Sequence, residues 1–293
     1  MFWVPITIAA AALQVARNAL QRGLLGDAGP WGATLVRFLF GLPFALVMWA
    51  AVAAVTPAAR PSFNPTYWLA AVTGALTQLV ASAALLVAMR RAGFAVGTAL
   101  QQSSLPLSAV IGLAVFHDNL SAQGWTGVAI TTVGLAILTW PKGAFGPQPV
   151  SGALFGLISG VCFGFSLNAF RHAELALEPA HRLYAAITSV TLAQAMQSAT
   201  LTAILALWRP SALRAVIAAW RQSLAAGLCG ALASAGWFTA IAYAPAGPVR
   251  AVGMVEMPIA AAAGRRMFKE RLSPLQLTAA GLTALGVVLA ALA

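Results

Sequence analysis

The sequence predicts an all-α integral membrane protein of ten transmembrane helices, arranged as two inverted repeats of five helices each. Three observations predict this fold class: the composition, a series of long apolar runs and an internal repeat. Hydrophobic residues make up 60% of the 293 residues, charged residues make up 8%, and the mean hydropathy is +0.85. Soluble domains carry charge on about a quarter of their residues, so this composition excludes a soluble fold.

The apolar runs account for the predicted helices one by one. A helix needs about 20 apolar residues to cross a hydrocarbon core of about 30 Å, whereas a transmembrane β-barrel would alternate apolar and polar residues. Charged residues, prolines and turn residues separate the runs, and the connections are too short to hold a soluble domain. The expected helices span residues 2–21, 31–55, 67–89, 94–116, 122–140, 151–170, 183–207, 223–243, 248–268 and 274–292.

The second half of the chain repeats residues of the first half in the same order and spacing. Alanine matches carry little weight in an alanine-rich chain, so the repeat rests on the other residue types. The matching residues are Pro106 with Pro258, Phe116 with Phe268, Leu120 with Leu272, Ser121 with Ser273, Thr131 with Thr283 and Gly134 with Gly286. The chain therefore divides into a first repeat, 1–147, and a second repeat, 148–293.

The number of helices in each repeat determines how the repeats are related. Because five is odd, the second repeat must enter the membrane upside down relative to the first. Inverted repeats are a recurring architecture of secondary transporters, whose substrate sites lie near the middle of the membrane between the repeats. The sequence therefore favours transport, with the lipid bilayer and a small-molecule substrate as partners.

A stripe of small residues runs along the sixth expected helix. Gly152, Gly156, Gly160 and Gly164 recur every four residues, and such a stripe lets another helix approach closely. We expect the stripe to line the seam between the repeats rather than a dimer interface, and we expect a monomer.

The corner before the last helix of each repeat has the residues of a helix start. Ser273 is followed by Pro274 and Gln276. The serine would cap the helix, the proline would occupy its first turn and the glutamine would complete a capping box. We expect Ser121 to cap the equivalent helix of the first repeat, with Asp118 just ahead of it, where the helix dipole favours negative charge.

Three stretches of the chain carry a family resemblance. "GPWGATLVRFLFGLPFAL" (29–46) has Arg37 after the turn into the second helix. "LPLSAVIGLAVFHDNLS" (105–121) and "FKERLSPLQLTAAGLTALGVVL" (268–289) hold the two corners, the first with Asp118 in place of the usual glutamate. In these patterns the chain resembles the drug/metabolite transporter superfamily (DMT), in particular its EamA-type branch of ten-helix proteins, over nearly its whole length.

The resemblance implies a function and a location. Proteins of this family are secondary transporters that export small metabolites by alternating access, and amino-acid exporters of the YddG type are the subgroup that the chain resembles most. The resemblance implies transport of amino acids, no cofactor, and a multi-pass position in the inner (plasma) membrane with both termini in the cytoplasm.

The charges of the connections conflict with that orientation. The positive-inside rule places the more basic connections in the cytoplasm. The even-numbered connections, which share a side with the termini, hold Arg60, Arg171, Arg182 and Arg250. The odd-numbered connections hold Arg22, Arg90, Arg91, Lys142, Arg209, Arg214, Arg221, Arg265, Arg266, Lys269 and Arg271. The family orientation is kept as the expectation because several of these residues can belong to helix ends.

Glu256 is the one carboxylate inside an expected transmembrane run, near the centre of the ninth helix. An ionised carboxylate at this depth is costly unless it faces water or a partner, so such residues are candidates for function. We expect Glu256 to bind an amine or to carry a proton during transport. The alternative is a packing role in which a neighbouring arginine neutralises it.

Pro106 and Pro258 occupy equivalent positions in the fourth and ninth expected helices. Proline removes a backbone hydrogen bond and frees the carbonyl four residues earlier, which here belongs to Gln102 and Met254. Broken helices at corresponding positions of two repeats indicate a binding site. We therefore expect hinges at Pro106 and Pro258.

Polar and aromatic side chains at mid-membrane depth complete the expected substrate site. Amides that line a wet cavity can bind both the carboxylate and the amine of an amino acid, although each alone can equally serve as an interhelical hydrogen bond of about 0.6 kcal/mol. Arg17 and Arg37 either extend to the membrane interface or hold a substrate carboxylate. The predicted substrate-binding residues are Gln14, Gln78, Ser82, Gln101, Gln102, Ser234, Trp237, Tyr243, Met254 and Glu256.

Other functions lack their sequence signatures. The net charge of +11 is spread over short connections, which indicates headgroup contacts and topology signals and no nucleic-acid partner. His172, Glu174, Glu178 and His181 lie close in sequence but without metal-ligand spacing, so we expect a solvated loop and no metal. Walker and nucleophile-elbow motifs are absent from the sequence, so neither an ATP-driven pump nor a serine hydrolase is expected.

Two alternatives to a transporter stay open. An intramembrane enzyme would need catalytic groups clustered at one depth, and Glu256 has no His, Asp or Cys near it in the sequence. A channel-like or structural membrane protein would need no such groups. Flux that does not saturate would indicate a channel, and product formed from a lipid without flux would indicate an enzyme.

Overall fold

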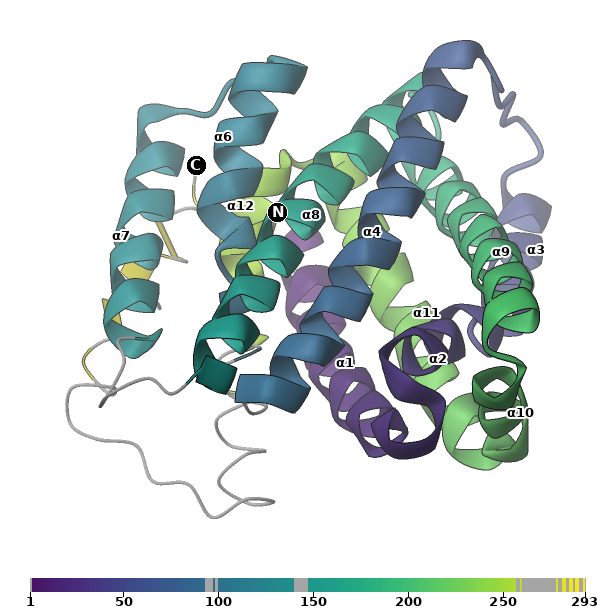
Figure 1. The fold of residues 1–293 in the computed structure, drawn as a ribbon. Helices are drawn as coiled ribbons and strands as arrows, with labels where there is room; N and C mark the ends of the chain where they lie inside the picture. Colours follow the sequence, from purple (N-terminus) through teal and green to yellow (C-terminus); the bar gives the residue numbers. More distant parts are fainter. Residues whose placement is uncertain are drawn as a thin grey trace.

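The computed structural model describes residues 2–92, 97, 100–139, 147–256, 259, 278, 281–282, 285–286, 288–289 and 292. Within these residues every regular element is an α-helix. The helices are α1 (Trp3–Gly23), α2 (Leu25–Leu39), α3 (Leu42–Val55), α4 (Pro65–Ala92), α6 (Ser104–Phe116), α7 (Ala122–Thr139), α8 (Pro147–Leu177), α9 (Arg182–Trp208), α10 (Pro210–Ala218), α11 (Trp220–Tyr243) and α12 (Ala246–Gly253) (Figure 1).

Several of these helices have the length and composition of membrane spans. Five stretches of the described chain qualify, and Ser104–Phe116 is a shorter apolar helix. The five spans are Ala28–Val55, Pro65–Ala92, Val150–Leu177, Arg182–Trp208 and Trp220–Tyr243. The predicted all-α class is therefore confirmed for the described residues, and five helical stretches could cross a membrane. The arrangement of ten helices in two inverted repeats stays a prediction.

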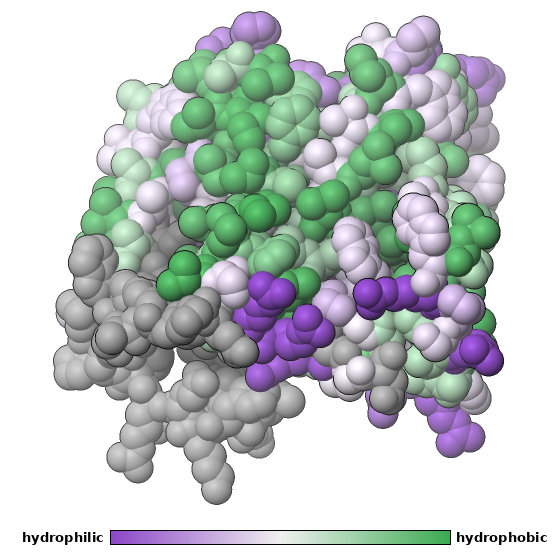
Figure 2. Space-filling view, viewed as in Figure 1, coloured by the Kyte–Doolittle hydropathy of each residue, from purple (hydrophilic) through white to green (hydrophobic). Residues whose placement is uncertain are grey.

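The surface of the bundle is apolar and its interior holds polar groups. On α4, Leu69, Val72, Leu76 and Val80 recur at helical spacing and are exposed. Figure 2 shows apolar residues spread over this face of the molecule, with hydrophilic residues gathered along its lower edge. Lipid cannot bond polar groups, so in a membrane protein they must find partners inside the bundle.

Two long helix pairs form the centre of the bundle. α1 packs along α11 and α4 packs along α8, and Figure 1 shows α4 and α8 side by side. α6 packs against α8 and α12, while α2 and α3 pack against α9. Each of these pairs joins the first predicted repeat to the second, so the two repeats are packed into each other rather than side by side.

The glycine stripe of α8 lies in this seam. A Cβ placed at Gly164 would lie 3.1 Å from the backbone nitrogen of Ser108 on α6. A Cβ at Gly152 would meet Ala92 at the end of α4. Next to the stripe, the side-chain amide of Asn168 donates to the carbonyl of Ser108 at 2.9 Å. The stripe therefore contacts the first repeat, as expected from its spacing.

Local sequence features explain where several helices begin and end. The chain breaks at Phe40 and Gly41, and Pro43 occupies the first turn of α3, where its missing N–H costs nothing. α6 ends at His117, whose φ of 58° is left-handed. α7 then begins at the predicted cap, because Ser121 Oγ accepts the N–H of Gly124 at 3.0 Å.

Some expected boundaries were wrong. The run 31–55 is two helices because of the break at Gly41, and α10 occupies a stretch that we expected to be a connection. α8 continues past residue 170, so His172 and Glu174 lie on a helix, and Glu174 is buried rather than solvated. The predicted hinge Pro258 and the second corner (Ser273, Pro274 and Gln276) lie outside the described residues.

The two ends of the bundle differ in their number of arginines. Two contacts identify the end that holds the N-terminus: Phe2 contacts Tyr243, with ring centroids 4.5 Å apart, and the N–H of Ser62 donates to the carbonyl of Leu177. Arg250, which we counted in a connection, is buried in α12. The helix ends and connections at the opposite end hold Arg22, Arg90, Arg91, Arg209, Arg214 and Arg221.

Gly164→Leu should separate α8 from α6, because its side chain would meet backbone atoms of Ser104 and Ser108 that cannot move aside. We expect a loss of about 1–3 kcal/mol in the free energy of unfolding, typical of overpacking. Thermal unfolding of the purified protein in detergent would measure it. Gly23→Leu is the control, since a Cβ at Gly23 meets no atom within 4 Å. Equal unfolding temperatures for the two variants would contradict the proposed close packing.

Candidate functional site

A small cavity lies at the centre of the bundle. Its volume is about 20 Å³, which leaves room for about one water molecule. Its walls come from α1, α2, α4, α8, α11, α12 and the residues that precede α6. The lining residues are Gln14, Arg37, Gln78, Gln101, Phe163, Leu167, Ser234, Trp237, Phe238 and Arg250. In this conformation the cavity is too small for a metabolite.

Glu256 lies beside the cavity, and both of its carboxylate oxygens accept hydrogen bonds. Its Oε1 accepts a hydrogen bond from the side-chain amide of Gln14 on α1. Its Oε2 accepts one from Gln102 Nε2 at 2.8 Å and lies 3.8 Å from Arg250 Nη1. Both side chains of this ion pair are almost entirely buried. The ion pair with a neighbouring arginine, on which the alternative packing role of Glu256 depends, is therefore present in the structure.

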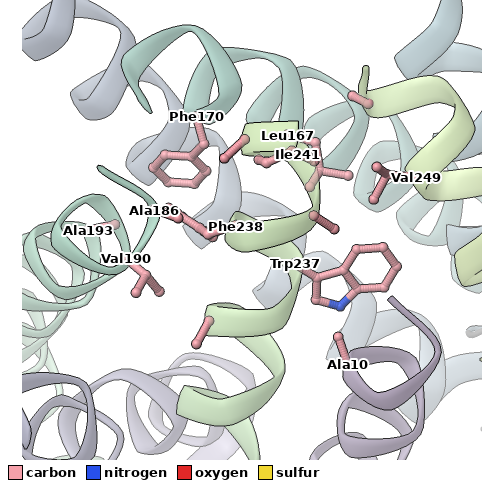
Figure 3. Packing of buried hydrophobic residues seen from close by; sticks show 14 of the residues in the cluster. Ala10, Leu167, Phe170, Ala186, Val190, Ala193, Trp237, Phe238, Ile241 and Val249 are labelled. Atoms are coloured by element: carbon pink, nitrogen blue, oxygen red, sulfur yellow. The ribbon is translucent and has the colours of Figure 1, made fainter. Parts of the chain in front are cut away.

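Arg250 is held by both repeats. Its Nη2 donates to Gln102 Oε1 at 2.5 Å, and its guanidinium lies 5.0 Å from the centroid of the Trp237 ring. The indole fits here because Gly253, one turn later on α12, has no side chain; a Cβ there would overlap the ring. Figure 3 shows the indole of Trp237 between Ala10 of α1 and Val249 of α12.

Two further arginines are buried beside the cavity. Arg37 on α2 donates to Ser82 Oγ at 2.9 Å and to Ser234 Oγ at 3.4 Å. Arg17 on α1 donates to Asn18 Oδ1 at 2.7 Å. The absence of a side chain at Gly230 on α11 lets both arginine side chains approach the same point. Both side chains are buried inside the bundle, which favours the second alternative, a contact with a substrate carboxylate, over extension to the membrane interface.

The chain breaks its helical course twice next to the cavity. Before α6 the helix is interrupted at Gln102 and Ser103, and after α12 it is interrupted at Met254 and Val255. These breaks fall at equivalent positions of the predicted repeats. The carbonyl of Gln102 is not free, since it accepts the N–H of Leu105 at 2.9 Å. The first predicted hinge, at Pro106, therefore lies just beyond an observed break.

The predicted site residues divide into three groups. Five of them line the cavity: Gln14, Gln78, Gln101, Ser234 and Trp237. Three others bond the charged groups of the site: Ser82, Gln102 and Glu256. The last two, Tyr243 and Met254, lie away from the cavity.

The two displaced residues have clear structural contacts. Tyr243 ends α11 and contacts Phe2 and the guanidinium of Arg182. Met254 is buried in an apolar cluster that includes Leu105 and Ala251. Neither residue belongs to the cavity lining.

Sequence reasoning missed Arg250, Phe238 and Leu167 as site residues. Arg250 was counted as a topology signal because it stands near the start of an expected helix. Its position inside the apolar run 248–268 was the signal that could have identified it. Phe238 and Leu167 carry no signal of their own, because apolar residues that line a cavity look like any others in the sequence.

A second group of charges closes the N-terminal end of the bundle. Asp118, after α6, lies 3.5 Å from both Arg171 Nε and His172 Nε2 of α8. Arg171 also donates to the carbonyls of Ile241 and Ala244 at the end of α11. We call Asp118, Arg171 and His172 the end cluster. It joins the first repeat to the second at this end.

Glu178 forms a separate contact at the same end. It accepts the backbone N–H of Arg60 at 2.6 Å, and its other oxygen lies 3.3 Å from His181 Nδ1. The bond from Arg60 holds the pKa of the Glu178 carboxyl below its usual value. Within the described residues no group of His, Cys, Asp and Glu side chains has the arrangement of a metal site.

Comparison with known proteins identifies the fold alone. No family model matches the chain, and no curated protein matches it. A solved structure described only as "Crystal structure of protein" aligns with 100% of this chain and 96% of its own, with a TM-score of 0.69 and 17% sequence identity. The helical arrangement thus occurs in a solved structure, while the resemblance to the drug/metabolite transporter superfamily stays a prediction.

Asp118→Asn should make stability less dependent on pH. Burial raises the pKa of the Asp118 carboxyl, but His172 and Arg171 lower it more, so the pKa lies below its ordinary value. The ionised carboxylate therefore stabilises the fold above the unfolded pKa of about 3.9, and this contribution is lost as the pH falls through the lower, folded pKa. We expect the variant to be less stable at pH 6, by about 1 kcal/mol.

Thermal unfolding of both proteins between pH 6 and pH 3 tests this prediction. The difference in unfolding temperature should shrink toward the acid end, since the wild-type carboxylate is then protonated. A difference that is the same at every pH would show that Asp118 acts through packing and not through its charge.

Proposed function

We propose that the protein is a secondary transporter that exports small metabolites bearing a carboxylate, with amino acids as the first class to test. One observation carries the proposal. Arg17, Arg37, Arg250 and Glu256 are all buried around a cavity at the centre of a membrane helix bundle. Ionisable groups inside a membrane are costly and mark the pathways of substrates and ions.

The pairing of the helices supports an inverted repeat. The predicted repeats match α1 with α8 and α4 with α11. A rotation that exchanges the two repeats would therefore place α1 on α8 and α11 on α4. The α1–α11 pair would then coincide with the α8–α4 pair, and these are the two long central pairs of the bundle. A two-fold relation between the repeats is expected to produce such a pattern, and alternating access commonly uses it.

The contacts around the site support a closed state. The cavity holds about one water molecule, and the end cluster ties α8 to the α6–α7 connection and to α11. We propose that export requires the end cluster to open and the cavity to widen. The breaks before α6 and after α12 would supply the flexible points, with Pro106 and Pro258 as the hinges.

We propose the inner membrane as the location, since the resemblance implies it. The resemblance also places both termini in the cytoplasm. The buried position of Arg250 removes one basic residue from the connections on that side, so the positive-inside rule opposes this orientation more strongly than the sequence count did. A reporter fused to the C-terminus distinguishes the two orientations.

Counterflow into proteoliposomes with a panel of labelled amino acids and the corresponding 2-hydroxy acids tests the transport function. We expect at least one substrate to enter faster than into empty vesicles, with a rate that saturates. Absence of flux for every substrate would contradict the proposal. Flux that does not saturate would favour a channel, and product formed from vesicle lipid without flux would favour an enzyme.

Glu256→Gln tests a role in proton coupling. The change keeps the size of the side chain but removes the charge that pairs with Arg250. If Glu256 carries the proton, counterflow in the variant should fall and lose its dependence on pH. Glu178→Gln is a matched control, since it makes the same change at a carboxylate outside both the central cavity and the end cluster, and it should keep the pH dependence. A Glu256→Gln variant with the wild-type pH profile would exclude the proton role.

A further inference from the structure

The charges around the central cavity do not balance. Arg17, Arg37 and Arg250 are each at most 4% exposed, and Glu256 is the one acid beside them among the described residues. Guanidinium groups stay charged in proteins. Three buried positive charges therefore face one negative charge. Because unpaired buried charge is costly, a further negative charge in this site would be favourable.

Both oxygens of Glu256 already have partners. One oxygen accepts Gln14, and the other accepts Gln102 and lies near Arg250. An ammonium group entering the cavity would have to share this carboxylate with Arg250. The ammonium would also be repelled by the other two arginines. The site is therefore poorly suited to the cationic half of a zwitterionic amino acid.

The arginines, in contrast, can donate further hydrogen bonds. Arg37 lines the cavity and donates to two neutral hydroxyls, those of Ser82 and Ser234. Arg17 Nη1 and Arg250 Nε are buried and have no hydrogen-bond partner in the described structure. A carboxylate is the natural ligand for such donors because a guanidinium can hold both of its oxygens.

The indole N–H of Trp237 is a further buried donor that favours an anionic ligand. Trp237 lines the cavity, and its indole Nε1 is buried without a partner in the described structure. Indole nitrogen donates and never accepts. Gln101 also lines the cavity, and its Oε1 is an acceptor without a partner in the described structure. Three donors without partners (Arg17 Nη1, Arg250 Nε and Trp237 Nε1) and one such acceptor favour a ligand that has several acceptor oxygens.

Part of the cavity lining is apolar. Phe163 and Leu167 of α8 and Phe238 of α11 line the cavity together with Trp237. Figure 3 shows Leu167, Trp237 and Phe238 within one packed apolar cluster. A ligand with a charged end and an apolar or aromatic body would therefore match both parts of the lining.

We propose that the central site binds organic anions that carry a carboxylate and an apolar body but no ammonium, in preference to the corresponding amino acids. This inference rests on the proposed function, since the anion is the cargo of the transporter. It assigns Arg37 to the carboxylate, Arg17 and Arg250 to the surrounding positive charge, and Trp237 to the body of the ligand. The cavity must widen to admit it.

A matched pair of ligands tests the inference on the wild-type protein. 3-Phenyllactate and phenylalanine have the same skeleton, but a hydroxyl in one replaces the ammonium in the other. Binding is measured by titration calorimetry in detergent, in buffer free of other carboxylates. We expect 3-phenyllactate to bind at least about tenfold more tightly, a difference of about 1.4 kcal/mol. Equal affinity, tighter binding of phenylalanine or no binding of either would overturn the inference.

Substitution of Arg37 tests the assigned contact. Arg37→Met removes the charge and should weaken binding of 3-phenyllactate more than tenfold, while Arg37→Lys keeps the charge and should retain part of the affinity. Arg90→Met, an exposed arginine at the end of α4, should bind as the wild type does. Equal affinity in the Arg37→Met variant would overturn the assignment. If that variant does not fold, the Arg37→Lys titration and the wild-type pair still decide the question.

Counterflow in proteoliposomes separates the inference from the proposed function. Binding of 3-phenyllactate without counterflow of any substrate supports the anion site and contradicts transport. Counterflow of phenylalanine but not of 3-phenyllactate supports transport and overturns the anion site. Saturable counterflow of 3-phenyllactate above that into empty vesicles supports both.

Discussion

The constraint on which the structure depends is the burial of charged groups where lipid offers them no hydrogen bonds. Charged and amide side chains in the centre of the bundle need partners inside the protein. Gln14 and Gln102, from the first repeat, hold Glu256 from the second. Ser234, from the second repeat, helps to hold Arg37 from the first. These bonds hold α1, α2, α11 and the segments beside α6 and α12 around a few polar atoms.

This constraint explains why the regular helices are interrupted where they are. A continuous helix through Gln102 or Met254 would present its side chains at fixed intervals along one face. The breaks at these positions let Gln102 bond both Arg250 and Glu256. Gly253 and Gly230 serve the same purpose, since small residues allow Trp237 and two arginine side chains to approach the neighbouring backbone. Local irregularity thus makes the central ion pair possible.

The sequence predicted the parts of the fold that depend on hydropathy and on local capping. α4, α7 and α9 lie within a few residues of their expected bounds, and Ser121 caps α7 as its position in the repeated corner indicated. The break between α2 and α3 was missed because Phe40 and Gly41 are as apolar as their neighbours. α10 was missed because its charged residues resemble those of a connection.

The site was predictable only in part, and for a physical reason. Polar residues inside apolar runs are conspicuous, so Gln14, Gln78, Gln101 and Glu256 could be identified from the sequence. Which residues bond to one another depends on how helices distant in the chain pack, and the sequence alone does not indicate this. Arg250 and Glu256 became partners through a helical break, and Tyr243 proved to lie at the end of its helix.

The bonds between the repeats have a consequence for how such a chain can be divided. Glu256, Arg37 and Asp118 each have at least one bonding or ionic partner in the other half of the molecule. A half expressed alone would carry these groups into lipid without those partners, at a cost that packing of five helices would have to offset. We therefore expect the two halves to behave as complementary fragments, each of which folds only when the other is expressed with it.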